Sequence, residues 1–286
     1  MKINELTLKF EKYLIEKERS EETRKGYLRD LKKLKRYLEI KYNGAVYIEE
    51  ITLDDLEDFF WYLKNEKKLE PKTRNRALYA IRALFKFAKN RDYIREDISK
   101  SLEPASTSEK ISLTLSEEEV KKFAKATNNI LMEIVVIILY YTGMRISELL
   151  NLRIQDVDFV EEYIKINGKG KKQRMIPINA KLKPVLEDYL KNKRPNVNTD
   201  YLIATEKTGR LSKAYVNQVF VETRLLLNLD KKVTPHTLRH SFATELVRSD
   251  ANLSYVQKLL GHENLDTTTI YIKADYNELN ETVNLI

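Results

Sequence analysis

The chain has 286 residues, a formal net charge of +8 at neutral pH and no cysteine. The lack of cysteine excludes disulfides, thiolate metal sites and a thiol nucleophile, and the basic balance favours a polyanionic partner. Residues 1–5 lack the apolar core of a signal peptide, and the most apolar run, residues 134–141, is too short to span a bilayer. We therefore expect a cytoplasmic protein without membrane association, with a length that suits two domains.

The first hundred residues predict four helices. We expect them over residues 3–18, from a Ser20 cap to about residue 40, after a Thr52 cap, and from Pro71 to about residue 90. The expected apolar side of the third helix consists of Leu56, Phe59, Phe60, Trp61 and Leu63. This pattern predicts a helical domain over residues 1–102.

A second, mixed domain is predicted over residues 113–286. The small and polar segment 103–112 before it has no periodicity and indicates a linker, and Ser116 and Glu119 after it have capping-box spacing. Residues 163–166 and 174–178 alternate around a glycine-bearing turn, which predicts a β-hairpin with a basic tip. Helices are expected elsewhere, so the fold class is mainly α with a small hairpin or sheet.

An apolar helix is interrupted at Gly143, and Arg145 and Glu148 begin the next helix. Their i,i+3 spacing lets the carboxylate orient the guanidinium. A plain helix salt bridge is the more ordinary explanation of such a pair taken alone.

All three histidines of the chain lie in one C-terminal stretch that ends in a tyrosine. Thr234 and Pro235 predict the cap and first residue of a helix, with His236 and Arg239 three apart on one face. Helix N-termini attract phosphate, so this pair predicts a phosphate site. An ordinary solvated helix face explains the pair equally well when it is considered alone.

Two further candidates follow the predicted helix at residues 253–260. Gly261 is expected to be the residue that ends this helix, which fixes His262 at a helix end. Tyr271 is expected on a short helix that begins at residue 266 or 267.

A zinc site is the main alternative for the histidines. His236 and His240 have the i,i+4 spacing of zinc-binding helices. The glutamate of His-Glu-x-x-His is absent, however, and Arg239 would place a cation beside the metal. We therefore expect no metal, and we expect His240 to be structural.

Basic residues strongly outnumber acidic ones over residues 64–95. A helix with this bias can follow a phosphate backbone, although a solvated helix face is the ordinary alternative. The candidate DNA-binding residues are Lys72, Arg74, Arg76, Arg82 and Lys86, with Lys171 and Lys172 at the hairpin tip.

Five segments in order resemble the motif set of the tyrosine recombinases, the phage integrase family. They are residues 142–149, 168–170, 236–244 and 260–262, and Tyr271. The resemblance covers nearly the whole chain, and the compact size without an extra arm-binding domain is similar to the Xer subgroup. The composition, rich in Lys and Glu, favours an archaeal Xer-type protein within it.

The resemblance implies a role for each candidate residue. Arg145 and Arg239 would clamp a scissile phosphate, and Tyr271 would attack it to give a 3′-phosphotyrosine. His236 would be the general base or proton shuttle. Because the bond energy stays in the phosphotyrosine, neither ATP nor a metal cofactor would be needed.

Three supporting roles are implied in the same way. Lys169 at the hairpin tip would protonate the 5′-oxygen leaving group, although Lys171 and Lys172 lie close by and could replace it. His262 would donate a hydrogen bond to the phosphate. Glu148 would hold the arginine in place.

The resemblance also implies an architecture and an assembly. A helical SAM-like core-binding domain and an α+β catalytic domain would form a C-shaped clamp around double-stranded DNA, and four protomers would join two duplexes. The tail, residues 272–286, would dock on a neighbouring protomer or pack on its own domain.

The function we expect is site-specific recombination, with resolution of chromosome dimers at a dif-like site. The alternatives are an integrase or resolvase of a mobile element, relaxation of the type IB topoisomerase kind, and a DNA-binding accessory protein with a silent site. The complete set of candidate catalytic residues argues against the last.

Overall fold

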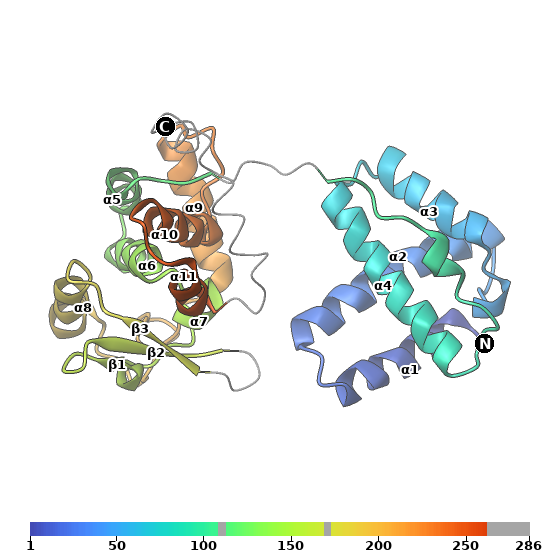
Figure 1. The fold of residues 1–286 in the computed structure, drawn as a ribbon, viewed down its shortest axis with the longest axis horizontal. Helices are drawn as coiled ribbons and strands as arrows, with labels where there is room; N and C mark the ends of the chain where they lie inside the picture. Colours follow the sequence, from blue (N-terminus) through green and yellow to red (C-terminus); the bar gives the residue numbers. More distant parts are fainter. Residues whose placement is uncertain (108–112, 169–172, 262–286) are drawn as a thin grey trace, which may run out of the picture. The chain divides into compact units, whose positions relative to one another are not determined.

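The computed structural model describes residues 1–107, 113–168 and 173–261. The chain divides into two compact units, Met1–Glu109 and Lys110–Ile286, which Figure 1 colours from blue to red along the sequence. Most of the described elements are helices, and the strands form one small sheet. The predicted fold class is therefore confirmed.

The N-terminal unit is a group of helices around one apolar core. Its elements are α1 (Ile3–Glu16), α2 (Glu21–Tyr42), α3 (Leu53–Asn65) and α4 (Pro71–Asn90), with the 3-10 turns η1 (Ile48–Glu50) and η2 (Ile98–Ser101). The Ser20 hydroxyl accepts a hydrogen bond from the amide of Thr23 at the start of α2, and Thr52 forms a capping box with Asp55 at the start of α3. The helix starts predicted from Ser20, Thr52 and Pro71 are thus confirmed.

One side chain of α3 lies on the face opposite to the predicted one. Leu56, Phe59 and Leu63 are buried, whereas Trp61 is 60% exposed. Each helical residue turns about 100°, so a residue two positions from both Phe59 and Leu63 points away from the core. The inclusion of Trp61 on the apolar side was therefore wrong.

The C-terminal unit is built around the apolar helix α6. Its helices are α5 (Glu117–Ala126), α6 (Ile130–Thr142), α7 (Ile146–Leu149), α8 (Lys183–Asp188), α9 (Lys213–Leu226), α10 (Pro235–Arg248) and α11 (Leu253–Leu260), with the 3-10 helix η3 (Ile154–Asp156) and the π-helix η5 (Tyr189–Lys193). Helix α6 packs against α5 and α10 (Figure 1). The capping box of Ser116 and Glu119 at the start of α5 is confirmed.

The sheet is antiparallel, in the order β1-β2-β3. Its strands are β1 (Val157–Asp158), β2 (Tyr163–Asn167) and β3 (Gln173–Pro177). In the hairpin, Ile164 pairs with Ile176 and Ile166 pairs with Arg174, and the three isoleucines are buried. The predicted hairpin is confirmed, whereas β1 was not predicted because two residues are too few to show alternation.

Helix α10 begins where the sequence predicts, and helix α11 has the predicted bounds. Thr234 and Thr237 form a capping box at the start of α10, and Pro235 is its first residue. Helix α11 ends at Gly261, which has a φ of 64°. The two helices pack through Ala243, Val256 and Leu260, so the end of α11 is fixed on α10.

No helix in the described part of the chain is long and apolar enough to cross a membrane.

Candidate active site

The turn after α6 depends on a glycine. Gly143 has a φ of +60°, and a Cβ atom there would lie 2.3 Å from Cδ1 of Phe242. A larger residue would need both a strained backbone and a displaced ring. The chain can therefore turn tightly here, and the carbonyl oxygen of Gly143 accepts a hydrogen bond from Nη1 of Arg239 at 2.7 Å.

Arg239 is held inside the unit by carbonyl oxygens. It lies in α10 and is 3% exposed, and its Nη2 donates to the carbonyl of Leu260 at 2.8 Å. One guanidinium thus connects the end of α6, the start of α10 and the end of α11.

Arg145 lies at the N-cap of α7 and keeps 46% of its side chain exposed. Its main-chain amide donates to Oε2 of Glu148 at 2.7 Å, and its Nη1 donates to Oε1 at 2.9 Å. Its Nη2 donates to the carbonyl of Gly261 at 3.3 Å. The predicted Arg145–Glu148 pair is therefore present, and Arg145 and Arg239 bind the carbonyls of two consecutive residues.

Glu148 receives a second arginine. Nη1 and Nη2 of Arg174 donate to its two carboxylate oxygens at 2.9 and 2.8 Å, and the Glu148 side chain is 8% exposed. Burial alone would raise the pKa of Glu148, but the hydrogen bonds from Arg174 and Arg145 outweigh it and lower the pKa to about 2. The carboxylate is ionised at neutral pH.

His236 lies in the first turn of α10 and is exposed. Its pKa is lowered from the ordinary histidine value because neighbouring groups reduce its hydration and because Arg239 and Arg145 are positively charged. The imidazole is therefore neutral at neutral pH, the form that accepts a proton. His240, one turn later, is 7% exposed.

The remaining catalytic candidates lie outside the described residues. They are Lys169, His262 and Tyr271, together with the DNA-binding candidates Lys171 and Lys172. Within residues 1–107, 113–168 and 173–261, no group of three His, Cys, Asp or Glu side chains could hold a metal ion.

The arrangement of the described residues suits a phosphodiester. Two guanidiniums are fixed in place before a ligand binds, and a neutral imidazole lies near them. Fixed donors of this kind stabilise charge that develops on phosphate oxygens, because they need no reorganisation during the reaction.

Two family models match this chain. The one described as the phage integrase family matches residues 114–278, and the one described as the phage integrase N-terminal SAM-like domain matches residues 8–92. The chain belongs to the phage integrase family.

Curated relatives narrow the assignment to the Xer tyrosine recombinases. The chain is 33% identical to tyrosine recombinase XerC of Natranaerobius thermophilus, over 94% of this chain and 93% of that one. It is 36% identical to tyrosine recombinase XerA of Pyrococcus horikoshii, over 73% and 72%. The chain is thus a Xer-type tyrosine recombinase, an enzyme of site-specific recombination that cuts and rejoins DNA.

A solved structure of the same kind matches the fold. It is the XerH site-specific recombinase bound to a palindromic difH substrate in a post-cleavage complex. The TM-score is 0.75 at 26% identity, and the match covers 91% of this chain and 78% of that one.

The DNA-binding candidates of this recombinase on α4 differ in their exposure and in their hydrogen bonds. Lys72 and Lys86 are exposed. Arg76 is also exposed but uses its Nε and Nη2 on the buried carboxylate of Asp30, at 2.7 and 3.0 Å. Arg82 donates to the carbonyls of Ser99 and Leu102. Arg74 is partly buried.

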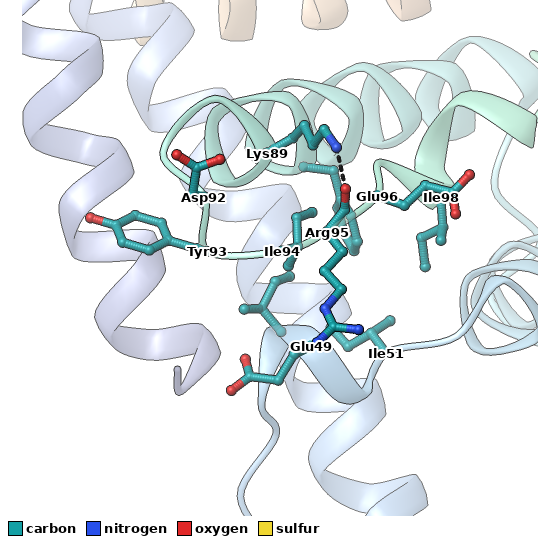
Figure 2. A pocket seen from close by; sticks show the side chains of 11 residues that line it. Glu49, Ile51, Lys89, Asp92, Tyr93, Ile94, Arg95, Glu96 and Ile98 are labelled. Atoms are coloured by element: carbon teal, nitrogen blue, oxygen red, sulfur yellow. Dashed lines mark hydrogen bonds between the residues drawn. The ribbon is translucent and has the colours of Figure 1, made fainter.

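The recombinase also has a cavity in its N-terminal unit, of about 680 Å³, beside the end of α4. Figure 2 shows Lys89 directed toward the carbonyl of Arg95, to which it donates a hydrogen bond. None of the candidate residues lines this cavity. The described residues of the candidate active site belong to the C-terminal unit.

Sequence reasoning missed one residue of the site, Arg174. Its position in an alternating strand was a usable signal, because Arg174 shares a face with the apolar residues Ile176 and Ile178. Burial of a charged residue on the apolar face of a strand costs free energy unless the charge is paired. The pattern therefore predicts a buried partner for this arginine.

Proposed function

We propose that this recombinase exchanges DNA strands through a phosphotyrosine on Tyr271 and resolves chromosome dimers at a dif-like site. The observation that carries the proposal is that Arg145 and Arg239 bind the consecutive carbonyls of Gly261 and Leu260. His262 is the next residue in the chain. The similarity to XerC and to a XerH complex with difH supports the dif-like substrate.

The two arginines bind the non-bridging oxygens of the scissile phosphate in this mechanism. The Tyr271 oxygen attacks phosphorus in line, a new O–P bond forms, and the bond from phosphorus to the 5′-oxygen breaks. The phosphodiester is exchanged and not hydrolysed, so no external energy source enters.

Protons move through neighbouring groups. His236, neutral at neutral pH, accepts or relays the tyrosine proton. Lys169 gives a proton to the leaving 5′-oxygen, and His262 donates a hydrogen bond to the phosphate. The 5′-hydroxyl of a second strand then attacks phosphorus and releases Tyr271.

We assign the parts of the chain accordingly. Residues 1–102 form the core-binding domain, residues 103–112 the linker and residues 113–286 the catalytic domain. Strand exchange between two duplexes needs four protomers in a synapse, with the tail 272–286 docked on a neighbour. A chromosomal substrate places the reaction in the cytoplasm.

A suicide substrate, whose nick lets the cut end diffuse away, tests this function. With a dif-like duplex, we expect a covalent protein–DNA adduct in the presence of EDTA. The adduct should be lost in Tyr271→Phe and kept in Tyr255→Phe, since Tyr255 is an exposed tyrosine of α11. An adduct that persists in Tyr271→Phe would contradict the assignment of the nucleophile.

A further inference from the structure

Arg174 connects three segments of the C-terminal unit. Its Nη1 and Nη2 donate to the carboxylate of Glu148 in α7. Its Nε donates to the carbonyl of Leu259 at the end of α11, at 2.8 Å. The side chain itself belongs to β3 and is 14% exposed. All three nitrogen atoms of the guanidinium therefore donate hydrogen bonds.

The strand register explains why this arginine points inward. Arg174 is paired with Ile166 and alternates with Ile176, and both isoleucines are buried. Directly paired residues of an antiparallel ladder lie on one face of the sheet. A cation on that face loses its hydration, and a partner such as the Glu148 carboxylate offsets the cost.

The end of α11 passes directly over the Arg174 side chain. A Cβ atom on Gly261 would lie 3.2 Å from Nη1 and 3.3 Å from Cδ of Arg174. The carbonyls of Leu259, Leu260 and Gly261 bind Arg174, Arg239 and Arg145 respectively. A helix C-terminus carries partial negative charge and favours cations, so one helix end gathers all three guanidiniums.

We propose that Arg174 is a positioning residue of the recombinase, which sets the place of the Arg145 guanidinium by fixing Glu148 and the end of α11. The proposal rests on the proposed function, in which Arg145 binds the scissile phosphate. Glu148 and the carbonyl of Gly261 are the two anchors of the Arg145 side chain. Arg174 binds Glu148 directly, and it binds the carbonyl of Leu259, two residues before Gly261. Loss of the Arg174 fork loosens both anchors at once.

Lysine in place of Arg174 provides a matched probe. It keeps the charge, but a single ammonium group on a flexible stem cannot bind both carboxylate oxygens and a helix carbonyl as a planar fork does. The control is Arg153→Lys, which alters an exposed ion pair with Asp200 in the same unit.

The first arm measures single-turnover adduct formation and DNA affinity. We expect Arg174→Lys to lower the cleavage rate about 10- to 100-fold, because misplacement of a binding group by about 1 Å has effects of that order. The DNA Kd should stay within about twofold, and Arg153→Lys should cleave like the parent chain. In an Arg145→Ala background, Arg174→Lys should cost little more. Cleavage at the parental rate, or the same fold-loss in both backgrounds, would overturn the proposal.

The second arm is independent of activity and follows hydrogen exchange. The Arg145 amide donates to Glu148, and the Ser116 amide donates to Glu119 in a similar capping box. In Arg174→Lys we expect exchange to rise several-fold at Arg145 and to stay unchanged at Ser116. If the parent chain forms no adduct, the proposed function fails, and this arm still decides the positioning role. Equal exchange at the Arg145 amide in the parent chain and in Arg174→Lys would refute the positioning role of Arg174.

Discussion

At the scale of single residues, the protonation state of His236 should set the pH range in which the enzyme cleaves DNA. Its pKa is lowered by reduced hydration and by Arg239 and Arg145. A base acts only when it is unprotonated, so the cleavage rate should hold as the pH falls to about 6.5, the ordinary histidine value, and decline only below it.

Single-turnover cleavage measured from about pH 5 to 8 checks this prediction. The acid limb should be missing in His236→Ala, which is expected to cleave slowly. A limb that lies above about pH 6.5 in the parent chain would mean that His236 is protonated in the active range.

Glu148 makes a different pH prediction, on stability. Its folded pKa of about 2 lies below the unfolded value of about 4.3. Its ion pairs therefore stabilise the fold fully above that unfolded value, and this contribution is lost as the pH falls toward the folded value. The free energy involved is about 3 kcal/mol.

Urea unfolding of Glu148→Gln at several pH values measures this contribution. The variant should be less stable by about 3 kcal/mol at neutral pH, and its stability should depend less on pH in the acid range. Glu161→Gln, at an exposed position, is the control. An unchanged acid profile in Glu148→Gln would show that the ion pairs do not link pH to stability.

Local spacing predicted part of the site and missed the rest for a physical reason. The i,i+3 spacing of Arg145 and Glu148 was enough to predict their contact. Arg174 reaches Glu148 only because the hairpin folds against α7 and α11, a tertiary contact that spacing does not encode. The use of consecutive carbonyls at the end of α11 depends on the same packing.

At the scale of elements, the turn after α6 is a sensitive point. Gly143→Ala should destabilise the chain by at least about 2 kcal/mol, because φ of +60° and a 2.3 Å approach to Phe242 add backbone strain to overpacking. Adduct formation should also fall, since the Gly143 carbonyl binds Arg239.

Gly26→Ala is the matched control for this substitution. Gly26 lies inside α2, and a Cβ atom there would meet nothing within 4 Å. Alanine should raise stability by about 0.5–1 kcal/mol. Thermal unfolding distinguishes the two, and equal Tm values for both variants would contradict the role of the Gly143 turn.

Helix α4 gives a prediction about DNA. Lys86 is exposed, so Lys86→Ala should weaken binding evenly across sequences and reduce the slope of log K against log salt by about 1. Anisotropy titrations at several salt concentrations measure this slope, and an unchanged slope in Lys86→Ala would exclude a phosphate contact.

Arg76→Ala should differ from Lys86→Ala in stability. It should destabilise the N-terminal unit by about 1–3 kcal/mol, because the buried carboxylate of Asp30 loses a partner.

Element boundaries followed local chemistry closely. Caps at Ser20, Thr52, Ser116 and Thr234 mark real helix starts because each forms hydrogen bonds within its own first turn. The prediction for Trp61 was wrong because it followed from the apolar character of the residue and not from its angle around the helix. The strand β1 is formed by pairing with β2, which no local pattern specifies.

At the scale of the whole molecule, function rests on residues far apart in the sequence. The motifs around Arg145 and Arg239 meet at the end of α11, where the two side chains bind the carbonyls of Gly261 and Leu260. Figure 1 shows α10 and α11 next to each other in the C-terminal unit.

The most direct test is to identify the side chain that carries DNA. Digestion of the suicide-substrate adduct and mass analysis of the DNA-linked peptide should find a nucleotide joined through its 3′-phosphate to Tyr271. The opposite end of the cut should carry a free 5′-hydroxyl. Linkage to any other side chain, or through a 5′-phosphate, would contradict the mechanism.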